Sequence, residues 1–338
     1  NFVPANLTIT AKTLTITADA QTKVYDSVDP VLTYTQSGLK SGDTLSGALT
    51  RELGENVGTF AIGQGNVTAG DNYAINFVPA NLTITAKTLT ITAAAQTKVY
   101  DSADPELTYT QSGLKSGDTL SGALARDPGE NVGTFAIRVG NLGNTNYSIT
   151  FNSANMTITT KTLTITAAAK TKVYDSADPE LTYTQSGLKS GDTITGVLNR
   201  VSGQDVGTFA ITQGNVSAGD NYTINFVPAN LTITTKTLTI IADAKSKVYD
   251  SVDPVLTYTQ SGLKAGDRIA GDLARVVGED VGTFEIKQGN VTAGNNYSIA
   301  FKSANLTITG KPMTVVVSTD FLLRRIGDEI PKTATYLS

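Results

Sequence analysis

Three aspartates recur at fixed positions in four successive stretches of this 338-residue chain. They are Asp26, Asp29 and Asp43; Asp101, Asp104 and Asp118; Asp175, Asp178 and Asp192; and Asp250, Asp253 and Asp267. Carboxylate oxygens are ligands that calcium prefers, so these acids form a candidate weak calcium site in each stretch. The alternative is that Asp-Ser-x-Asp-Pro is a turn, in which Asp bonds its own backbone and Pro fixes φ.

Other chemistry is poorly supplied. The chain has no His, no Cys and no Trp, which excludes a serine triad, a thiol nucleophile and a His/Cys zinc site. Paired carboxylates, as in glycosidases, are still available. They keep a carbohydrate-active enzyme as the third and least favoured of three functional hypotheses. We therefore predict no catalytic residues, no enzyme activity and no cofactor other than the candidate calcium.

A lysine precedes Val-Tyr-Asp in each stretch, at Lys23, Lys98, Lys172 and Lys247. One hypothesis is an isopeptide bond from this lysine to an asparagine, with an acid as the catalyst. The alternative is that the lysine guards an edge strand against pairing with another chain.

These residues recur because the whole sequence recurs. Lys-Thr-Leu-Thr-Ile begins at Lys12, Lys87, Lys161 and Lys236, a period of about 75 residues that indicates a tandem array. We predict repeats at 12–86, 87–160, 161–235 and 236–310, with the end of a preceding repeat at 1–11 and a partial, diverged fifth repeat at 311–338. The structural unit is therefore one small domain.

Within a repeat, the pattern is that of β-strands. Apolar residues alternate with polar ones, mostly threonine, around Leu14, Leu32, Phe60, Ile75 and Leu82. Turn residues separate these segments at intervals of about 8–12 residues, which favours an all-β sandwich.

The predicted fold class is all-β: a tandem array of small Ig-like β-sandwich repeats that form an extended rod. The alternative is a β-grasp-like repeat with one short helix near residues 45–49. The glycine-rich segment 63–71 is expected to be a hairpin loop. The rod is inferred from segment 83–91, which passes between repeats without a Gly-, Pro- or Ser-rich linker.

The tyrosines keep the same period. All except Tyr336 lie at three repeated positions, first occupied by Tyr25, Tyr34 and Tyr73. We expect them to pack in the core with the phenol tip at the surface. A stacking platform for sugars or bases is the alternative, and the absence of Trp disfavours it.

Charge and variability bear on the partners. The net charge of −4 disfavours nucleic acid, and no apolar run is long enough to span a membrane. The copies differ mainly at 50–53 and 63–71, which we interpret as surface loops. The expected partners are neighbouring repeats, with host or matrix glycans or proteins as further candidates.

The string K-V-Y-D-S-x-D-P-x-L-T-Y at 23–34, with G-T-F-A-I at 58–62 and L-T-I-T at 82–85, resembles the MBG repeat. This "mostly beta, glycine-rich" domain, similar to the YDG repeat, occurs in arrays in large bacterial surface proteins and adhesins. The resemblance covers 1–310, and segment 326–331 with Tyr336 fits a diverged fifth copy.

The resemblance implies an extracellular stalk, at a bacterial cell surface or in a biofilm matrix, that projects an adhesive or anchoring domain. It carries no catalytic residues. The alternative function is a repeated, low-affinity module that binds glycan or matrix through its variable loops, with avidity from the number of copies.

Overall fold

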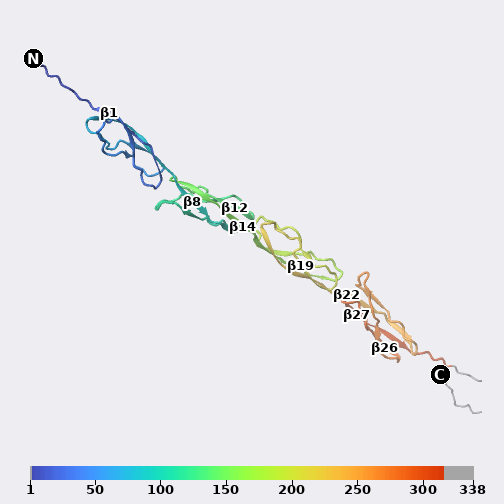
Figure 1. The fold of residues 1–338 in the computed structure, drawn as a ribbon. Coiled ribbons are helices and arrows are strands. Elements are labelled where there is room, and N and C mark those ends of the chain that lie inside the picture. Colours follow the sequence, from blue (N-terminus) through green and yellow to red (C-terminus); the bar gives the residue numbers. More distant parts are fainter. Residues whose placement is uncertain (1, 316–338) are drawn as a thin grey trace, which may run out of the picture. The chain divides into compact units, whose positions relative to one another are not determined.

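The computed structural model describes residues 2–315, which form strands, turns and loops without a helix (Figure 1). The predicted all-β class is confirmed. The helix of the β-grasp alternative is wrong, because segment 45–49 has no helical turn: Ser46 forms an isolated bridge to Thr68, and Gly47 lies at a bend with a φ of 87°. The described part of the chain also has no helix long and apolar enough to cross a membrane. Segment 326–331 and Tyr336 lie outside the described residues.

Each repeat contributes seven strands. The first has β1 (Lys12–Ala18), β2 (Gln21–Val24), β3 (Tyr34–Ser37), β4 (Thr50–Arg51), β5 (Gly58–Gly63), β6 (Tyr73–Val78) and β7 (Ala80–Thr85). The second has β8 (Lys87–Ala93), β9 (Gln96–Val99), β10 (Tyr109–Ser112), β11 (Ala125–Arg126), β12 (Gly133–Arg138), β13 (Tyr147–Asn152) and β14 (Ala154–Thr159). The third has β15 (Lys161–Ala167), β16 (Lys170–Val173), β17 (Tyr183–Ser186), β18 (Asn199–Arg200), β19 (Gly207–Thr212), β20 (Tyr222–Val227) and β21 (Ala229–Thr234). The fourth has β22 (Lys236–Ala242), β23 (Lys245–Val248), β24 (Tyr258–Ser261), β25 (Ala274–Arg275), β26 (Gly282–Lys287), β27 (Tyr297–Lys302) and β28 (Ala304–Thr309).

The seven strands of the first repeat form two facing sheets. In one sheet, β1 lies between β3, which is antiparallel to it, and β6, which is parallel. The other has the order β2–β7–β5–β4, with β2 and β7 parallel and the other pairs antiparallel. Leu14 and Ile16 of the first sheet share a core with Ile62 and Leu82 of the second. Sheets of three and four strands are those of a small Ig-like sandwich.

The apolar and polar residues that alternate in the sequence of β1 are alternately buried and accessible in the strand. Leu14 and Ile16 are fully buried, whereas Thr15 and Thr17 between and after them remain partly accessible. Each fully buried leucine or isoleucine side chain stabilises the fold by about 1.5–3 kcal/mol. The β-branched threonines suit the outer face of the pleated strand.

The glycine-rich segment 63–71 is not a hairpin loop. The strands that flank it, β5 and β6, belong to different sheets, so the segment crosses between the two layers of the sandwich. Pro79 has a similar position, because it separates β6 of one sheet from β7 of the other. Alternation identifies a strand but not its partner, so two strands that are adjacent in the sequence do not have to pair as a hairpin.

The chain divides into two compact units. The first consists of 1–163, 189–192 and 218–223, and the second of 164–188, 193–217 and 224–338. The first unit therefore contains two whole repeats and the segments of the third that adjoin the second. The second unit contains the rest of the third repeat and the fourth.

Gly129 in the second repeat leaves no room for a side chain. Its φ is 147°, and an added Cβ would lie 2.1 Å from Cε1 of Phe135. We expect Gly129→Ala to lower the free energy of unfolding of this repeat by about 2–3 kcal/mol. Hydrogen exchange in peptides unique to the repeat measures this. Gly117→Ala is the control, since its φ is 91° and an added Cβ meets no atom within 4 Å; equal losses in the two variants would contradict the overlap.

Candidate functional site

A tight turn follows the second strand of each repeat, β2 in the first, and lies next to the end of the repeat's last strand. We call residues 25–30 and their counterparts the end turn. The backbone N–H of Tyr25 donates to Thr85 O of the last strand at 2.8 Å, and Ser27 N and Oγ both donate to Val24 O. Asp26 has a φ of 67°, in the left-handed region that Asp tolerates better than most residues. The predicted turn is present, and it is attached to the strand that leaves the repeat.

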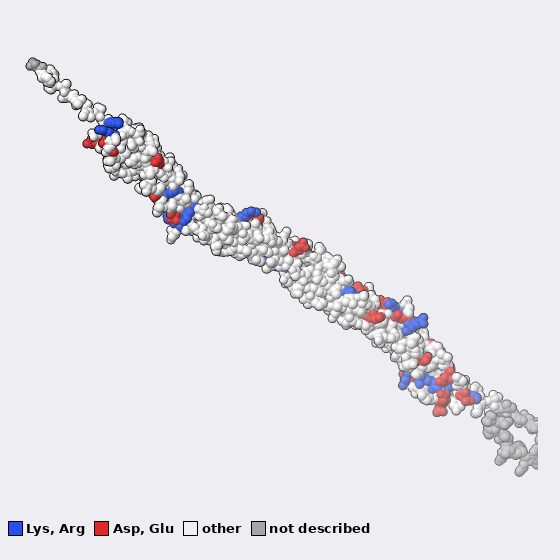
Figure 2. All heavy atoms as spheres, viewed as in Figure 1, with Lys and Arg blue, Asp and Glu red and all other residues white. Residues whose placement is uncertain are grey.

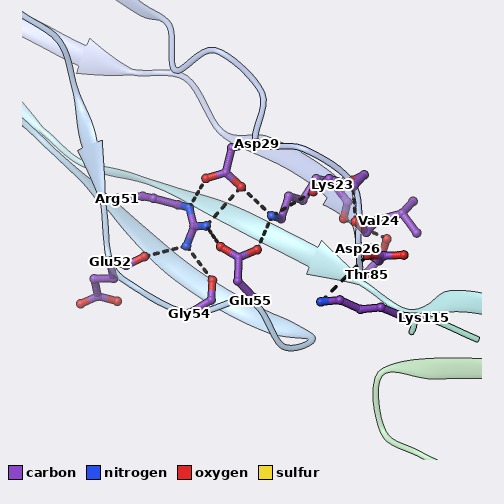
Figure 3. Close-up of polar contacts among 11 residues, drawn as sticks. Lys23, Val24, Asp26, Asp29, Arg51, Glu52, Gly54, Glu55, Thr85 and Lys115 are labelled. Carbon is purple, nitrogen blue, oxygen red and sulfur yellow. Dashed lines mark hydrogen bonds and ion pairs between the residues drawn. The ribbon is translucent and has the colours of Figure 1, made fainter. Parts of the chain in front are cut away.

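An ion cluster of Lys23, Asp29, Arg51 and Glu55 supports the end turn (Figure 3). The side chain of Lys23 is only 4% exposed, and its Nζ lies 2.5 Å from Asp29 Oδ1 and 2.6 Å from Glu55 Oε2. Arg51 contacts the same two carboxylates, with Nε 2.7 Å from Asp29 and Nη2 2.5 Å from Glu55. Two cations and two anions balance, so the buried ammonium is fully paired.

Arg51 uses all of its donors. Besides Asp29 and Glu55, its Nη1 donates to Glu52 O at 2.8 Å and to Gly54 O at 2.7 Å. Its guanidinium carbon lies 5.7 Å from the ring centroid of Phe60. A rigid fork with every N–H engaged fixes the loop after β4 relative to the end turn.

The lysine of the cluster stays charged. In the second repeat, the hydrogen bonds that Lys98 donates to Asp104 and Glu130 raise the pKa of Lys98 above its usual value. Arg126 and then Lys98 lower the pKa of Asp104 to about 2. A protonated amine is not a nucleophile, and its partners are carboxylates. The isopeptide bond to an asparagine stays a hypothesis, to be checked by loss of ammonia in the intact mass.

The alternative prediction is that these lysines lie on an edge strand and guard it. Their position on an edge strand is confirmed, but their side chains do not extend into solvent. Lys23 lies on β2, the outermost strand of its sheet, but its side chain is directed into the ion cluster and is nearly buried. An inward-pointing charge is itself a way to protect an edge.

The structure does not bring the predicted calcium ligands together. Asp29 belongs to the ion cluster, Asp26 accepts from a lysine of the next repeat, and Asp43 accepts from the Tyr73 hydroxyl at 2.5 Å. Within residues 2–315, no three acidic side chains are grouped so as to hold a metal ion.

The calcium hypothesis is open to a direct measurement. Calcium bound at these acids predicts that a chelator lowers the melting temperature. Lysine ammonium groups already lie against Asp26 and Asp29, and for that reason we expect the melting temperature to be unchanged by chelation. Thermal unfolding with and without chelator decides between the two.

The end turn packs into the next repeat, and we call this contact the joint. Tyr25 is 5% exposed, and its ring centroid lies 5.5 Å from that of Tyr147 at an interplanar angle of 76°. The hydroxyls of both tyrosines donate to Asp118 Oδ2, at 2.9 and 2.5 Å respectively. Tyr25 and Ile84 of the first repeat lie in the same apolar cluster as Leu89 of the second. The core therefore continues across the joint.

Polar contacts surround these rings. Lys87, the first residue of the second repeat, donates to Asp26 Oδ2 at 2.8 Å. Asn146 Oδ1 accepts from Val57 N at 3.0 Å, and its Nδ2 donates to Asn56 at 3.0 Å. Only one residue separates β7 from β8. A bend here would break these bonds as well as the tyrosine packing.

The joint recurs with nearly the same geometry. The pairs Tyr100–Tyr222 and Tyr174–Tyr297 both have centroids 5.5 Å apart at 77°. Their shared acceptors are Asp192 and Asp267, each 3.0 Å from the hydroxyl of the end-turn tyrosine. The lysine pairs also recur, as Lys161–Asp101 and Lys236–Asp175, both at 2.7 Å. The second of the three joints lies within the first compact unit, and the third lies within the second unit.

The core prediction is right for Tyr25 and its counterparts in the second and third repeats, whereas Tyr249, the counterpart in the fourth, is 45% exposed. Tyr25 is core material, yet its phenol tip bonds Asp118 instead of reaching the surface. Arg51 and Glu55 were missed altogether. A signal existed for Arg51, because arginine is unchanged in all four copies inside a segment that otherwise varies.

The third repeat carries a natural variant of the ion cluster. Gln204 replaces the glutamate of the other repeats, and its Oε1 accepts from Lys172 Nζ at 2.7 Å. We expect Gln204→Glu to stabilise this repeat by about 0.5–1 kcal/mol, because it supplies the missing anion at an exposed site. Glu130→Gln should destabilise the second repeat by a similar amount. Hydrogen exchange in each repeat tests the pair, and changes of the same sign would rule out charge as the cause.

The fold and the joints define a tandem β-sandwich repeat protein. The sequence matches the MBG domain (YGX type) at 14–83, 89–157, 163–232 and 238–307. The chain therefore belongs to the MBG domain (YGX type) family, and the resemblance seen in its motifs is confirmed. MBG repeats are a non-enzymatic type of module.

Among solved structures, the crystal structure of Drosophila N-cadherin EC1-4 is similar at 9% identity and a TM-score of 0.22. The match covers 77% of this chain and 85% of that one. A likeness of this strength carries no argument about function. No curated protein matches the chain.

Proposed function

We propose that the chain is a structural stalk segment of a bacterial cell-surface or biofilm-matrix adhesin. It holds an adhesive or anchoring domain away from the cell. Membership of the MBG family supports a repeated extracellular module of structural or adhesion type. The observation that carries the proposal is the joint, which recurs three times with ring centroids 5.5 Å apart.

Because every joint uses the same residues, each repeat can bind the next one in the same way. Each repeat carries an end turn that contacts the next repeat. It also carries an aspartate and a tyrosine in the positions that contact the end turn of the repeat before it. Exposing a buried tyrosine costs about 2–4 kcal/mol, so a joint with this contact resists bending. Stiff joints support the prediction that the array is an extended rod.

The surface also suits a spacer. On the face drawn in Figure 2, charged residues of both signs are spread along the surface in small groups, separated by uncharged surface. Long-range attraction of a charged partner requires a field of one sign. A surface of mixed charge contributes solubility without such attraction.

Two measurements on the chain test the proposal. Small-angle scattering should give a rod-like profile, and a compact profile would overturn the stiff array. Glycan and matrix binding should be absent. Binding that weakens steeply as repeats are removed would overturn the pure stalk in favour of the alternative, a repeated binding module with avidity.

A further inference from the structure

The first two strands of a repeat run side by side with its last two strands, in the same direction. In the second repeat, β8 pairs in parallel with β13 over six residue pairs, from Lys87↔Tyr147 to Thr92↔Asn152. After two residues the chain continues as β9, which pairs in parallel with β14 over four residue pairs. Only one residue separates β13 from β14. We call 87–99 the entry segment and 147–159 the exit segment.

The chain enters the repeat at one end of these two paired segments and leaves it at the other end. The chain enters at Lys87, opposite the start of the exit segment at Tyr147, and leaves at Thr159, opposite Val99 at the end of the entry segment. Tension on the chain draws the two segments past each other along their common axis. The hydrogen bonds of a parallel ladder are evenly spaced, so all of the pairs resist this sliding together.

We propose that each repeat is a force-bearing module in which the entry and exit segments form a shear clamp. The proposal rests on the proposed function, because a stalk that holds an anchored domain transmits tension along its own chain. It adds that resistance to tension resides in these two parallel ladders, with the joint serving a separate role.

The same clamp is present in the first and fourth repeats. The first has the six pairs of β1 with β6 and the four of β2 with β7, and the fourth has the six of β22 with β27 and the four of β23 with β28. The ion cluster reinforces one segment, since Lys98 of β9 contacts Asp104 and Glu130 beyond the ladder. Sliding of the entry segment therefore also strains the ion pair between Lys98 and Glu130, which lie 32 residues apart in the chain.

The direction of pulling tests the clamp without changing the fold. The chain has no cysteine, so two introduced cysteines define where the force acts. Ala86→Cys with Thr160→Cys loads the second repeat along the clamp. Ala86→Cys with Thr145→Cys pulls apart the adjacent ends of β8 and β13, where Lys87 N donates to Asn146 O at 3.1 Å, and breaks the ladder pair by pair.

Single-molecule pulling on the full chain should give an unfolding force at least about threefold higher in the first geometry, because forced unfolding follows the barrier that the load meets. Equal melting temperatures of the two variants confirm that only the direction differs. Equal unfolding forces would overturn the clamp. The fourth repeat supplies a second pair of variants, Thr235→Cys with Gly310→Cys and Thr235→Cys with Asn295→Cys.

The clamp and the stalk fail in different ways. Equal forces in both directions, together with rod-like scattering and no glycan binding, would overturn the clamp and leave the stalk. Glycan binding by the segment would overturn the pure stalk, whatever the ratio of the two forces.

Discussion

Asp104→Ala is expected to lower the free energy of unfolding of the second repeat by about 2 kcal/mol at neutral pH. The change leaves Lys98 and Arg126, whose side chains are 4% and 10% exposed, with Glu130 as their one remaining anion in the cluster. The figure is below the 3–5 kcal/mol typical of fully buried pairs, because the Asp104 side chain is 41% exposed and partly screened by water.

Hydrogen exchange in the peptides of the second repeat measures this loss. Asp127→Ala in the same repeat is the matched control, because its partner Arg138 is 64% exposed and the pair is a surface one. We expect the control to cost less than about 0.5 kcal/mol. An equal loss in both variants would show that burial of the ion cluster adds nothing.

The same carboxylate predicts a dependence on pH. Its pKa in the folded protein is about 2, lower than the ordinary value of 3.8, because Arg126 and Lys98 bond the ionised form. The unfolded chain therefore takes up the proton first as the pH falls. Stability from this group is complete above about pH 4 and is lost as the pH falls toward 2. Asp104→Ala should flatten the curve in that window, and an unchanged slope would contradict the assignment.

Local pattern was enough to predict the strands but not their partners. Leu14 and Ile16 alternate with threonine, and they are the buried residues of β1. The pairing of β1 with β6 joins residues 61 positions apart (12 and 73), and nothing in the alternation of either strand specifies it. Tertiary context decides between equivalent strand partners.

The candidate site shows the same limit more strongly. The end turn was recognised from Asp and Pro, but Asp29 acts through ion pairs with Lys23 and Arg51 rather than by capping its own backbone. Arg51 lies 22 residues away in the sequence. Tyr25 finds its acceptor, Asp118, 93 residues away in another repeat. A contact between two repeats cannot be predicted from the residue pattern within one repeat.

Tyr174→Ala should both destabilise the third joint and make it flexible. The ring is 4% exposed, packs edge-on against Tyr297 and donates to Asp267, so truncation removes a large buried side chain and a hydrogen bond. Truncation of a buried aromatic costs about 3 kcal/mol or more. Tyr174→Phe keeps the ring and loses only the hydroxyl, which should cost about 1 kcal/mol.

Flexibility separates a joint from an ordinary core position. Spin labels on Thr208→Cys and Thr283→Cys, exposed residues of β19 and β26, report the distance between the third and fourth repeats. Tyr174→Ala should broaden the distance distribution, and Tyr174→Phe should leave it narrow. Tyr183→Ala is the control, because Tyr183 lies on β17 inside the third repeat, away from the joint. Equal broadening in the control, or an unchanged width in Tyr174→Ala, would mean that the tyrosine does not hold the repeats together. The covalent connection through Thr235 would then be the source of any stiffness.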